Sequence, residues 1–402
     1  MVGTTFRAMR SPQFRRYWLG AFFSFVGSWI QNVAQSWLVY ELTRSEFLLG
    51  LVGFVQGLPM LFLAPIGGAI SDRWNRRTIL LVTQSIFALS ALTLALLTFT
   101  GWVRYEFILG LVLLNGLVLS VDLPTRQSLV GHLVPREDLG NGIALNAAAF
   151  HTARILGPAI GGLLLEWFGP APCFLINGLS FSAILLALWT IRLQNSHEKP
   201  HATRLWDSLR EGVQFVTGRR GLLMLWLNVM VLSAFGLSYL VLLPVFADKV
   251  FGIGKAGLGQ LYTAAGIGSL MGLLLVARLS GEVPKGWLVL VAANGFAWCV
   301  MGFAHAPNAW VAKGLLMLAG MFGVMQLVST NTALQTSAPD SLRGRVVALH
   351  SWAINGPAPF ASLLIGQLAQ MWGASLAVTV SVSVCAVFGL VLLTVREVRA
   401  LE

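Results

Sequence analysis

A cluster of charges separates two long apolar runs near the start of the chain. The cluster holds one acid and three arginines, and each flanking run is long enough to cross a bilayer as a helix. The residues are Asp72, Arg73, Arg76 and Arg77, between apolar runs at 48–70 and 79–100. A carboxylate there can pair with the arginines or accept hydrogen bonds from the free N–H groups at a helix start. The chemistry expected is charge pairing at a membrane surface, not catalysis.

A second pair of opposite charges lies inside another apolar segment. Asp122 and Arg126 are four residues apart, with Pro124 between them. This spacing places both side chains on one face of a helix. Charges inside a bilayer cost several kcal/mol, so each needs a reason to be there. An ordinary ion pair along one helix is the plain interpretation of this spacing.

Further polar side chains occur within apolar segments and could line a central cavity. Amides facing lipid would lack partners, so their helix faces must look inward. The candidates are Gln31, Asn32, Gln35, Asn115, His151, Arg154, Tyr239 and Asn355. Arg154 could attract an anionic group, and His151 could exchange protons near neutral pH. Each amide could instead make a helix–helix hydrogen bond, and His151 could be a neutral histidine satisfied by a neighbour.

Composition excludes several classes of protein. The 402 residues are 56% hydrophobic and 11% charged, whereas a soluble domain has about 25% charged residues. The net charge of +11 does not indicate nucleic-acid binding, because the basic residues lie between apolar segments. We find no phosphate-binding loop, no catalytic triad and no metal-ligand spacing. The chain is therefore expected to be no enzyme and to need no cofactor or metal.

The apolar segments predict an all-α membrane protein with twelve transmembrane helices in two six-helix bundles. The segments are 17–40, 48–71, 79–100, 105–126, 140–166, 172–192, 222–247, 258–279, 286–304, 308–331, 344–370 and 374–395. The predicted domains are bundles at 1–193 and 222–402, joined by a cytoplasmic linker at 194–221. Within the linker, Leu205, Leu209, Val213 and Val216 recur at helical spacing. They predict an amphipathic helix on the membrane surface; a plain solvated linker is the alternative.

Charge distribution and an internal repeat support this topology. Of 27 Lys and Arg residues, 21 fall on the side that carries both termini and five on the other. Because positive loops stay inside the cell, both termini of this multi-pass membrane protein are expected to be cytoplasmic. The halves also match at an offset of 204 residues, as a duplicated six-helix unit would. The matches pair Pro135, Gly140, Ala144, Leu145, Gly162 and Gly169 with Pro339, Gly344, Ala348, Leu349, Gly366 and Gly373.

The charged cluster resembles the signature loop of the major facilitator superfamily, Gly-x-x-x-Asp-Arg-x-Gly-Arg-Lys/Arg. Matching residues are Gly68, Asp72, Arg73, Arg76 and Arg77. Asn75 replaces the usual glycine, and asparagine tolerates a left-handed backbone better than most residues. The resemblance implies that Asp122 pairs with Arg76 and that such contacts form a gate on the cytoplasmic side; an ordinary i, i+4 pair with Arg126 is the alternative. It also implies that the loop acid meets the start of the eleventh helix, near Arg343 and Arg345.

The fifth segment contains Gly157, Pro158, Gly161 and Gly162, and resembles the Gly-Pro-x-x-Gly-Gly core of a drug–proton antiporter motif. This favours export; a kinked packing helix is the alternative. Segments 7–18, 28–37 and 122–127 resemble the enterobactin-exporter-like, or transmembrane secretion effector, group of the superfamily.

The group resemblance implies export, across the bacterial inner membrane, of a small amphipathic molecule such as a siderophore, a macrolide or a drug-like compound. Transport would proceed by alternating access and be coupled to protons. The partners implied are the lipid bilayer, the small-molecule substrate and protons, with no nucleic acid and no obligate protein partner. A lipid or lysolipid flippase, a nutrient importer and a non-transporting receptor remain alternatives. The substrate and the coupling ion stay open.

Overall fold

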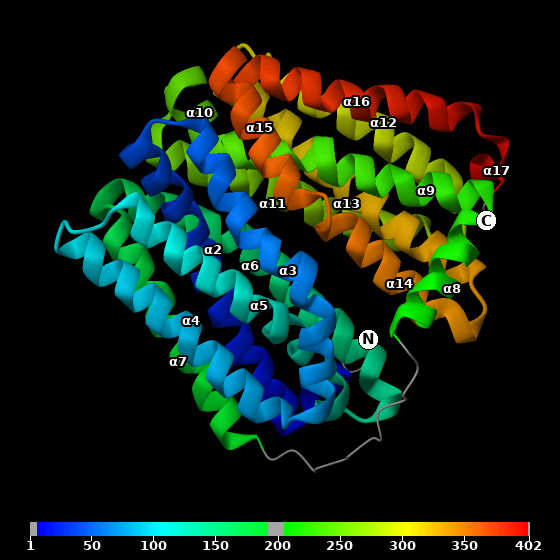
Figure 1. The fold of residues 1–402 in the computed structure, drawn as a ribbon, viewed down its shortest axis with the longest axis horizontal. Helices are drawn as coiled ribbons and strands as arrows, with labels where there is room; N and C mark the ends of the chain where they lie inside the picture. The colour runs from blue at the N-terminus through cyan, green and yellow to red at the C-terminus, as the bar shows by residue number, and fades with distance from the viewer. Residues whose placement is uncertain (1–5, 192–204, 401–402) are drawn as a thin grey trace. The chain divides into compact units, whose positions relative to one another are not determined.

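The computed structural model describes residues 6–191 and 205–400, and this part of the chain is built from helices without a β-sheet (Figure 1). The first half contains η1 (Arg7–Arg10), α2 (Pro12–Thr43), α3 (Glu46–Arg73), α4 (Arg76–Phe99), α5 (Tyr105–Leu133), η2 (Arg136–Asp138), α6 (Leu139–Phe168) and α7 (Pro170–Thr190). The second contains α8 (Leu205–Thr217), α9 (Arg220–Val231), η3 (Leu232–Gly236), η4 (Leu237–Leu242), α10 (Leu243–Val245), η5 (Phe246–Val250), α11 (Gly254–Leu279), α12 (Lys285–Ala304), α13 (Ala309–Ser337), α14 (Asp340–Asn355), α15 (Ala358–Trp372), α16 (Ala374–Thr394) and α17 (Arg396–Arg399).

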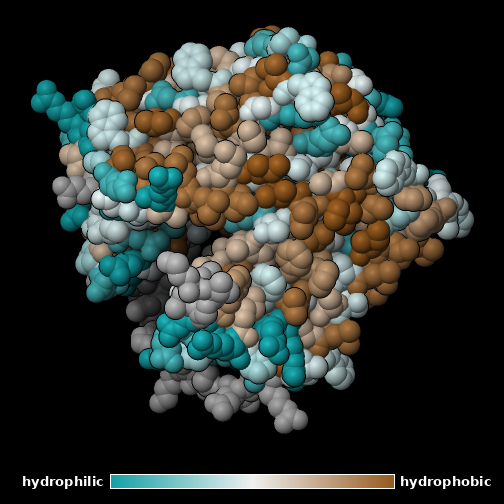
Figure 2. All heavy atoms as spheres, turned by 180° about the vertical axis from the view of Figure 1, so that it is seen from behind, coloured by the Kyte–Doolittle hydropathy of each residue, from teal (hydrophilic) through white to brown (hydrophobic). Residues whose placement is uncertain are grey.

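These helices confirm the predicted membrane fold. Within the described residues, ten helical stretches are long and apolar enough to span a bilayer. The two other predicted crossings are α2, which carries polar residues along its length, and the eleventh segment, which is split into α14 and α15. Figure 2 shows apolar side chains exposed over much of one face. Exposed indoles such as Trp74, Trp102 and Trp310 lie at helix ends, as expected at a membrane interface.

Capping residues explain where two helices of the first half begin. The Ser11 hydroxyl accepts a hydrogen bond from Phe14 N–H at 3.3 Å, and Pro12 follows it at the start of α2. The Asn75 side chain accepts hydrogen bonds from the N–H groups of Arg77 and Thr78 at the start of α4. Asn75 has φ −64° and ψ 113°. Asparagine therefore serves as the N-cap in an extended conformation, and its tolerance of a left-handed backbone is not used here.

The seventh and eleventh membrane segments are irregular. After α9 the seventh passes through π-turns, at Leu232–Gly236 and Phe246–Val250, and a 3₁₀ stretch at Leu237–Leu242. The eleventh breaks at Gly356, and Pro357 is the N-cap of the next helix, α15. Such interruptions inside helices often occur at functional hinges. These are the places where the second half departs from straight helices.

The chain packs into two compact units that exchange short segments. Unit 1 comprises Met1–Arg44, Val55–Pro200 and Gly254–Thr263, and unit 2 comprises Ser45–Phe54, His201–Ile253 and Ala264–Glu402. The predicted domains follow chain order. In the structure, the first turns of α3 belong to unit 2 and the first turns of α11 belong to unit 1.

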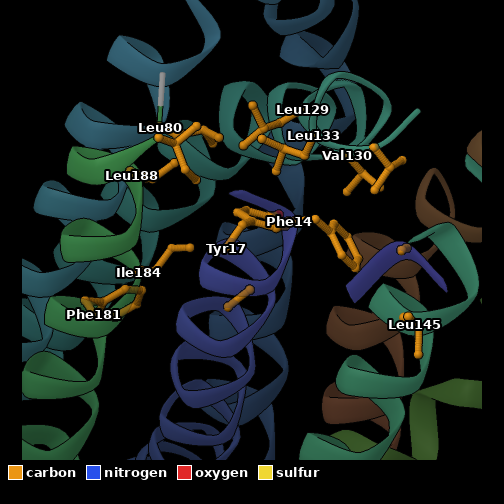
Figure 3. Close-up of a cluster of buried hydrophobic side chains, with 14 residues drawn as sticks. Phe14, Tyr17, Leu80, Leu129, Val130, Leu133, Leu145, Phe181, Ile184 and Leu188 are labelled. Atoms are coloured by element: carbon orange, nitrogen blue, oxygen red, sulfur yellow. The ribbon is translucent and has the colours of Figure 1, made fainter. Parts of the chain in front are cut away.

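Unit 1 has an apolar core near the start of α2. Phe14 and Tyr17 of α2 lie between side chains of α4, α5 and α7 (Figure 3). The cluster includes Leu80, Leu129, Val130, Leu133, Leu145, Phe181, Ile184 and Leu188. Lipid tails are as apolar as these side chains, so close packing rather than escape from water stabilises such contacts within a membrane. The cluster fixes the ends of the helices that carry Asp122 and the charged loop.

One hydrogen bond occurs at equivalent places in the two units. The Trp18 indole donates to Leu145 O at 2.8 Å in unit 1, and the Trp226 indole donates to Leu349 O at 3.1 Å in unit 2. Leu145 and Leu349 are themselves related by the 204-residue offset. The duplicated architecture inferred from weak sequence matches is thus repeated in the bonding that joins the first helix of each half to the fifth.

Replacing either indole should therefore have a similar effect. Trp18→Phe and Trp226→Phe keep most of the aromatic surface but remove the donor. Each should lower the free energy of unfolding by about 1 kcal/mol, the usual value of one hydrogen bond. Denaturation in detergent followed by circular dichroism measures this, with the exposed Trp189→Phe as control. Equal stability of all three variants would contradict the prediction.

Candidate functional site

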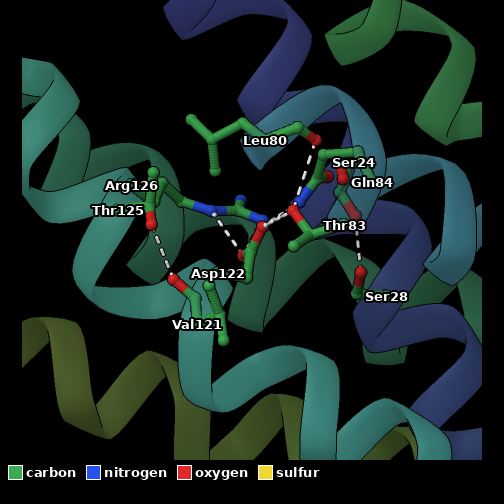
Figure 4. Close-up of polar contacts among 9 residues, drawn as sticks. All are labelled: Ser24, Ser28, Leu80, Thr83, Gln84, Val121, Asp122, Thr125 and Arg126. Carbon is green, nitrogen blue, oxygen red and sulfur yellow. Dashed lines mark hydrogen bonds and ion pairs between the residues drawn. The ribbon is translucent and has the colours of Figure 1, made fainter. Parts of the chain in front are cut away.

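The centre of the site is a buried carboxylate with four hydrogen bonds (Figure 4). Asp122 Oδ1 accepts from Thr83 Oγ1 and from Gln84 Nε2, both at 2.6 Å. Asp122 Oδ2 accepts from the Arg126 guanidinium at 2.8 and 3.2 Å. The aspartate is 1% exposed. Burying both charges is costly, and the full set of hydrogen bonds is what offsets that cost.

Two helices position this cluster. α5 carries Asp122 and Arg126 one turn apart, and α4 presents Thr83 and Gln84 side by side. The aromatic ring of Phe25, from α2, lies 5.1 Å from the guanidinium carbon of Arg126. A ring face next to a guanidinium adds an attractive cation–π contact. The cluster therefore ties three helices of unit 1 together.

Glycines allow a further helix, α3, to touch α5 next to the cluster. A Cβ added to Gly67 would lie 2.0 Å from Ser120 O, and one added to Gly116 would lie 2.5 Å from Gln56 O. No real side chain fits at such distances, so α3 and α5 are in backbone contact at both places. Gly68, the glycine of the signature motif, has nothing within 4 Å of its added Cβ. The close approach needs Gly67, which the motif does not single out.

The arginines of the charged loop contact other partners than the expected one. The Arg76 guanidinium lies 3.3 Å from His132 Nε2, while Asp122 is bound by Arg126. The Arg76–Asp122 pair implied by the resemblance is not formed in this structure. The Arg77 guanidinium donates to Leu188 O at 2.7 Å and Trp189 O at 2.8 Å. It thereby satisfies free carbonyls at the end of α7.

The remaining loop residues are placed as follows. Arg73 is exposed at the end of α3, and the side chain of Asp72 lies outside the described residues. At the start of α14, Arg343 pairs with Asp340 at 2.9 Å. Arg345 pairs with Glu211 of α8. Both ion pairs lie within unit 2, and the contact of Asp72 with this helix start stays a prediction.

The linker does contain a helix, α8, as its residue spacing indicates. Val216 is buried in a cluster with Val346 and Leu349 of α14, and Gly212 lies against Arg345. In Figure 1, α8 and α14 lie side by side. One face of α8 is therefore packed against protein. Residues 194–204 and the side chains of Leu205 and Leu209 lie outside the described part of the chain.

The amides of α2 are divided between protein contacts and solvent-accessible surface. Gln31 Oε1 accepts from Asn177 Nδ2 of α7 at 2.7 Å, and Gln31 Nε2 lies 3.5 Å from Gln35 Oε1. Gln31 therefore makes the helix–helix hydrogen bond that was the alternative to a cavity role. Asn32, one residue on, is exposed. On α5, the Asn115 amide oxygen is buried and has no hydrogen-bond partner.

Arg154 of α6 lies in an aromatic environment. Its guanidinium carbon is 5.6 Å from the centre of the Trp29 ring, and Trp29 contacts Phe150 edge to face. His151 lies next to Phe150 on the same helix and is half-buried. Tyr262 of α11 forms a hydrogen bond with Ser36 and lies near the Arg154 guanidinium. Unit 1 thus presents a cation against the ring of Trp29, with the hydroxyl of Tyr262 nearby.

Two other candidates lie in unit 2. Tyr239 is buried against the rings of Phe296 and Phe303. Asn355 is exposed at the end of α14 and donates to Ser351 O at 2.9 Å. Tyr239 is therefore part of an aromatic cluster in this structure, whereas Asn355 is accessible.

The glycines of α6 each face another helix. An added Cβ at Gly157 would lie 2.4 Å from Trp29 Cβ, and one at Gly161 would lie 3.0 Å from Ile30 Cα. At Gly162 it would lie 2.8 Å from Gly259 Cα of α11. Pro158 lies within α6 between them. The run lets α6 pass α2 and α11 at backbone distance.

In the described residues, no group of three or more His, Cys, Asp or Glu side chains could hold a metal ion.

Comparison with known proteins decides the family. The model of the transmembrane secretion effector family matches residues 3–402. The chain belongs to this family of major facilitator transporters. It is 23% identical to the staphyloferrin A transporter of Staphylococcus aureus, covering 89% of each chain. It is 27% identical to the enterobactin exporter EntS of Escherichia coli, covering 90% of this chain and 86% of the relative.

Solved structures agree on the fold. A mutant of the nucleoside transporter NupG superposes with a TM-score of 0.78 at 13% identity, covering 95% of this chain and 99% of NupG. A D-xylose-proton symporter gives a TM-score of 0.75 at 16% identity, covering 96% of this chain and 97% of the symporter. At such identities the likeness shows the fold alone. The family member described here is thus a multi-pass membrane transporter of small molecules and not an enzyme.

Proposed function

We propose that this transporter exports a siderophore-like, anionic molecule across the bacterial inner membrane. The observation that supports this most is the full-length similarity to two siderophore transporters. Siderophores carry acidic oxygen groups, and Arg154 is a cation among aromatic and polar side chains of α2, α6 and α11. A charge-assisted hydrogen bond from a guanidinium suits such groups. The flanking rings suit the apolar part of an amphipathic molecule.

Alternating access is the mechanism proposed, with both termini in the cytoplasm and protons as the coupling ion. The Asp122 cluster and the arginines around it fix the helices of unit 1, so rearranging them changes the state of the transporter. His151 is the residue proposed to exchange a proton near the substrate, because it is half-buried one turn from Arg154. The motif at Gly157 and Pro158 supports export rather than uptake.

Changing Arg154 tests the substrate assignment. Arg154→Gln should lower the transport efficiency for an anionic siderophore about tenfold or more, since a hydrogen bond to a charged group contributes about 1.5–3 kcal/mol. Arg154→Lys keeps the charge and should lose less. Flux is measured in inverted vesicles with an anionic siderophore and, as control, a neutral macrolide. An equal loss of transport for both compounds would show that Arg154 does not recognise the anionic group.

The direction is tested in cells with and without the gene under iron limitation. Mass spectrometry of cells and medium should show siderophore retained inside the deletion strain and released again on complementation. Reduced uptake with no retention would instead identify an importer. Lipid redistribution between leaflets with no change in siderophore would identify a flippase.

A further inference from the structure

Two helix starts are held by matching side chains. At the start of α11, the Ala256 N–H donates to Glu166 Oε2, at the end of α6, at 3.2 Å. At the start of α3, Gln370 Oε1, near the end of α15, accepts from the Glu46 N–H at 3.1 Å and the Ser45 hydroxyl at 2.9 Å. Glu166 and Gln370 are related by the 204-residue offset of the internal repeat. In both halves, a side-chain oxygen at this position accepts a hydrogen bond from an N–H group at the start of another helix.

One turn below each contact, two glycines touch. An added Cβ at Gly162 would lie 2.8 Å from Gly259 Cα, and one at Gly366 would lie 3.0 Å from Gly50 Cα. Gly162 and Gly366 are again related by the 204-residue offset. We call the α6–α11 contacts latch A and the α3–α15 contacts latch B. Latch A comprises Glu166, Ala256, Gly162 and Gly259, and latch B comprises Gln370, Glu46, Gly366 and Gly50.

Each latch holds the first turns of a helix whose remainder belongs to the other unit. Latch A lies in unit 1, but α11 continues into unit 2 from Ala264. Latch B lies in unit 2, but α3 continues into unit 1 from Val55. By the predicted topology, both latches lie at the helix ends away from the termini. In the alternating access proposed above, opening at that side would separate these segments from α6 and α15.

The two latches differ in charge. Glu166 is an exposed carboxylate at the start of α11, where free N–H groups and the helix dipole favour negative charge. Gln370 offers only a neutral amide oxygen. The charged groups around them are Lys255, which pairs with Glu41 at 3.4 Å, and Lys249, which pairs with Glu46 at 2.7 Å. Latch A should therefore weaken with added salt, whereas the Gln370 contact should not.

We propose that Glu166 and Gln370 are paired positioning residues that keep these helix ends closed and release them during transport. The proposal rests on the alternating access proposed above. At the glycine pairs the helices touch through their backbones, with no side chain between them. The hydrogen bonds from Glu166 and Gln370 then set how often each contact opens.

Spin-label distances measure the opening directly. One pair replaces Trp167 and Ile253 beside latch A, and another replaces Phe47 and Met371 beside latch B. Glu166→Gln keeps an acceptor but removes the charge, so it should raise the open fraction at latch A about two- to fivefold at low salt. The increase should disappear at about 1 M salt, where charges are screened within about 3 Å. Gln370→Leu should raise the open fraction at latch B at both salt concentrations.

The controls are Glu106→Gln, which removes an exposed acid at the start of α5, and Gln367→Ala, which alters an exposed glutamine one turn from Gln370. Both should leave the distances unchanged. Unchanged distances in Glu166→Gln and Gln370→Leu, or a salt-independent Glu166 effect, would overturn the latch proposal. The distances are measured without substrate. If the latches open as expected but the protein transports no siderophore, only the proposed function is refuted.

Discussion

Asp122→Ala should abolish transport and lower the free energy of unfolding by about 3–5 kcal/mol. The substitution removes the acceptor for Thr83, Gln84 and Arg126 at once. The guanidinium of Arg126, whose side chain is 14% exposed, would then have no counterion at its present position. An uncompensated buried charge accounts for most of the expected loss. Chemical denaturation in detergent, followed by circular dichroism, measures it.

A paired substitution separates stability from function. Asp122→Leu with Arg126→Leu removes both charges, and apolar replacement of a whole buried pair is often neutral for stability. The double variant should regain most of the stability lost in Asp122→Ala but none of the transport, if the pair serves the cycle. Recovery of both would assign the pair a structural role only. A single Asp122→Ala variant as stable as the wild type would contradict the whole account.

The sequence predicts contacts between residues that are close to each other along the chain. The i, i+4 spacing of Asp122 and Arg126 is enough to predict that they share a helix face, and the structure joins them. Thr83 and Gln84 cannot be found in this way, because their contact with Asp122 depends on how α4 is rotated against α5. Rotation is set by packing between helices, which a single sequence does not record.

The resemblance to the signature loop predicts the position of the loop but not the contacts of its residues. It locates the loop correctly, but Asn75 caps α4 in an extended conformation instead of adopting a left-handed one. Arg76 meets His132, which the sequence does not mark, because a lone histidine at a helix end has many possible roles. The motif also points to Gly68, whereas the contact that requires glycine is at Gly67. A motif fixes residue types; the partner helix decides which of them touch.

The internal repeat holds more information than residue identity reveals. The offset of 204 relates six identical residue pairs, and the same arithmetic relates Glu166 to Gln370. Because one of the two is an acid and the other an amide, an identity comparison passes over them. Only the shared role, accepting hydrogen bonds at the start of another helix, makes the pair visible. That role depends on the neighbouring helix, so it emerges from the structure.

Gly259→Val should separate α11 from α6 and stop transport. A Cβ on Gly259 would lie 2.5 Å from Pro158 O and 2.6 Å from Gly162 Cα, and both are backbone atoms that cannot move aside. Overpacking of this kind costs about 1–3 kcal/mol. That energy corresponds to a shift of about 5–150-fold against the closed contact. The distance between labels at Trp167 and Ile253 should lengthen in most molecules.

The matched control is Gly314→Val, because Gly314 lies inside α13 with nothing within 4 Å of an added Cβ. It carries the same change in helix propensity without the steric conflict, so it should leave distance and transport unchanged. Gly50→Val tests the equivalent contact in unit 2, where the added Cβ would lie 2.3 Å from Ser362 O. If closure of either glycine contact is needed for each cycle, both Val variants fail in transport while still folding. A Gly259→Val protein that transports like Gly314→Val would mean that α6 and α11 need not touch at all.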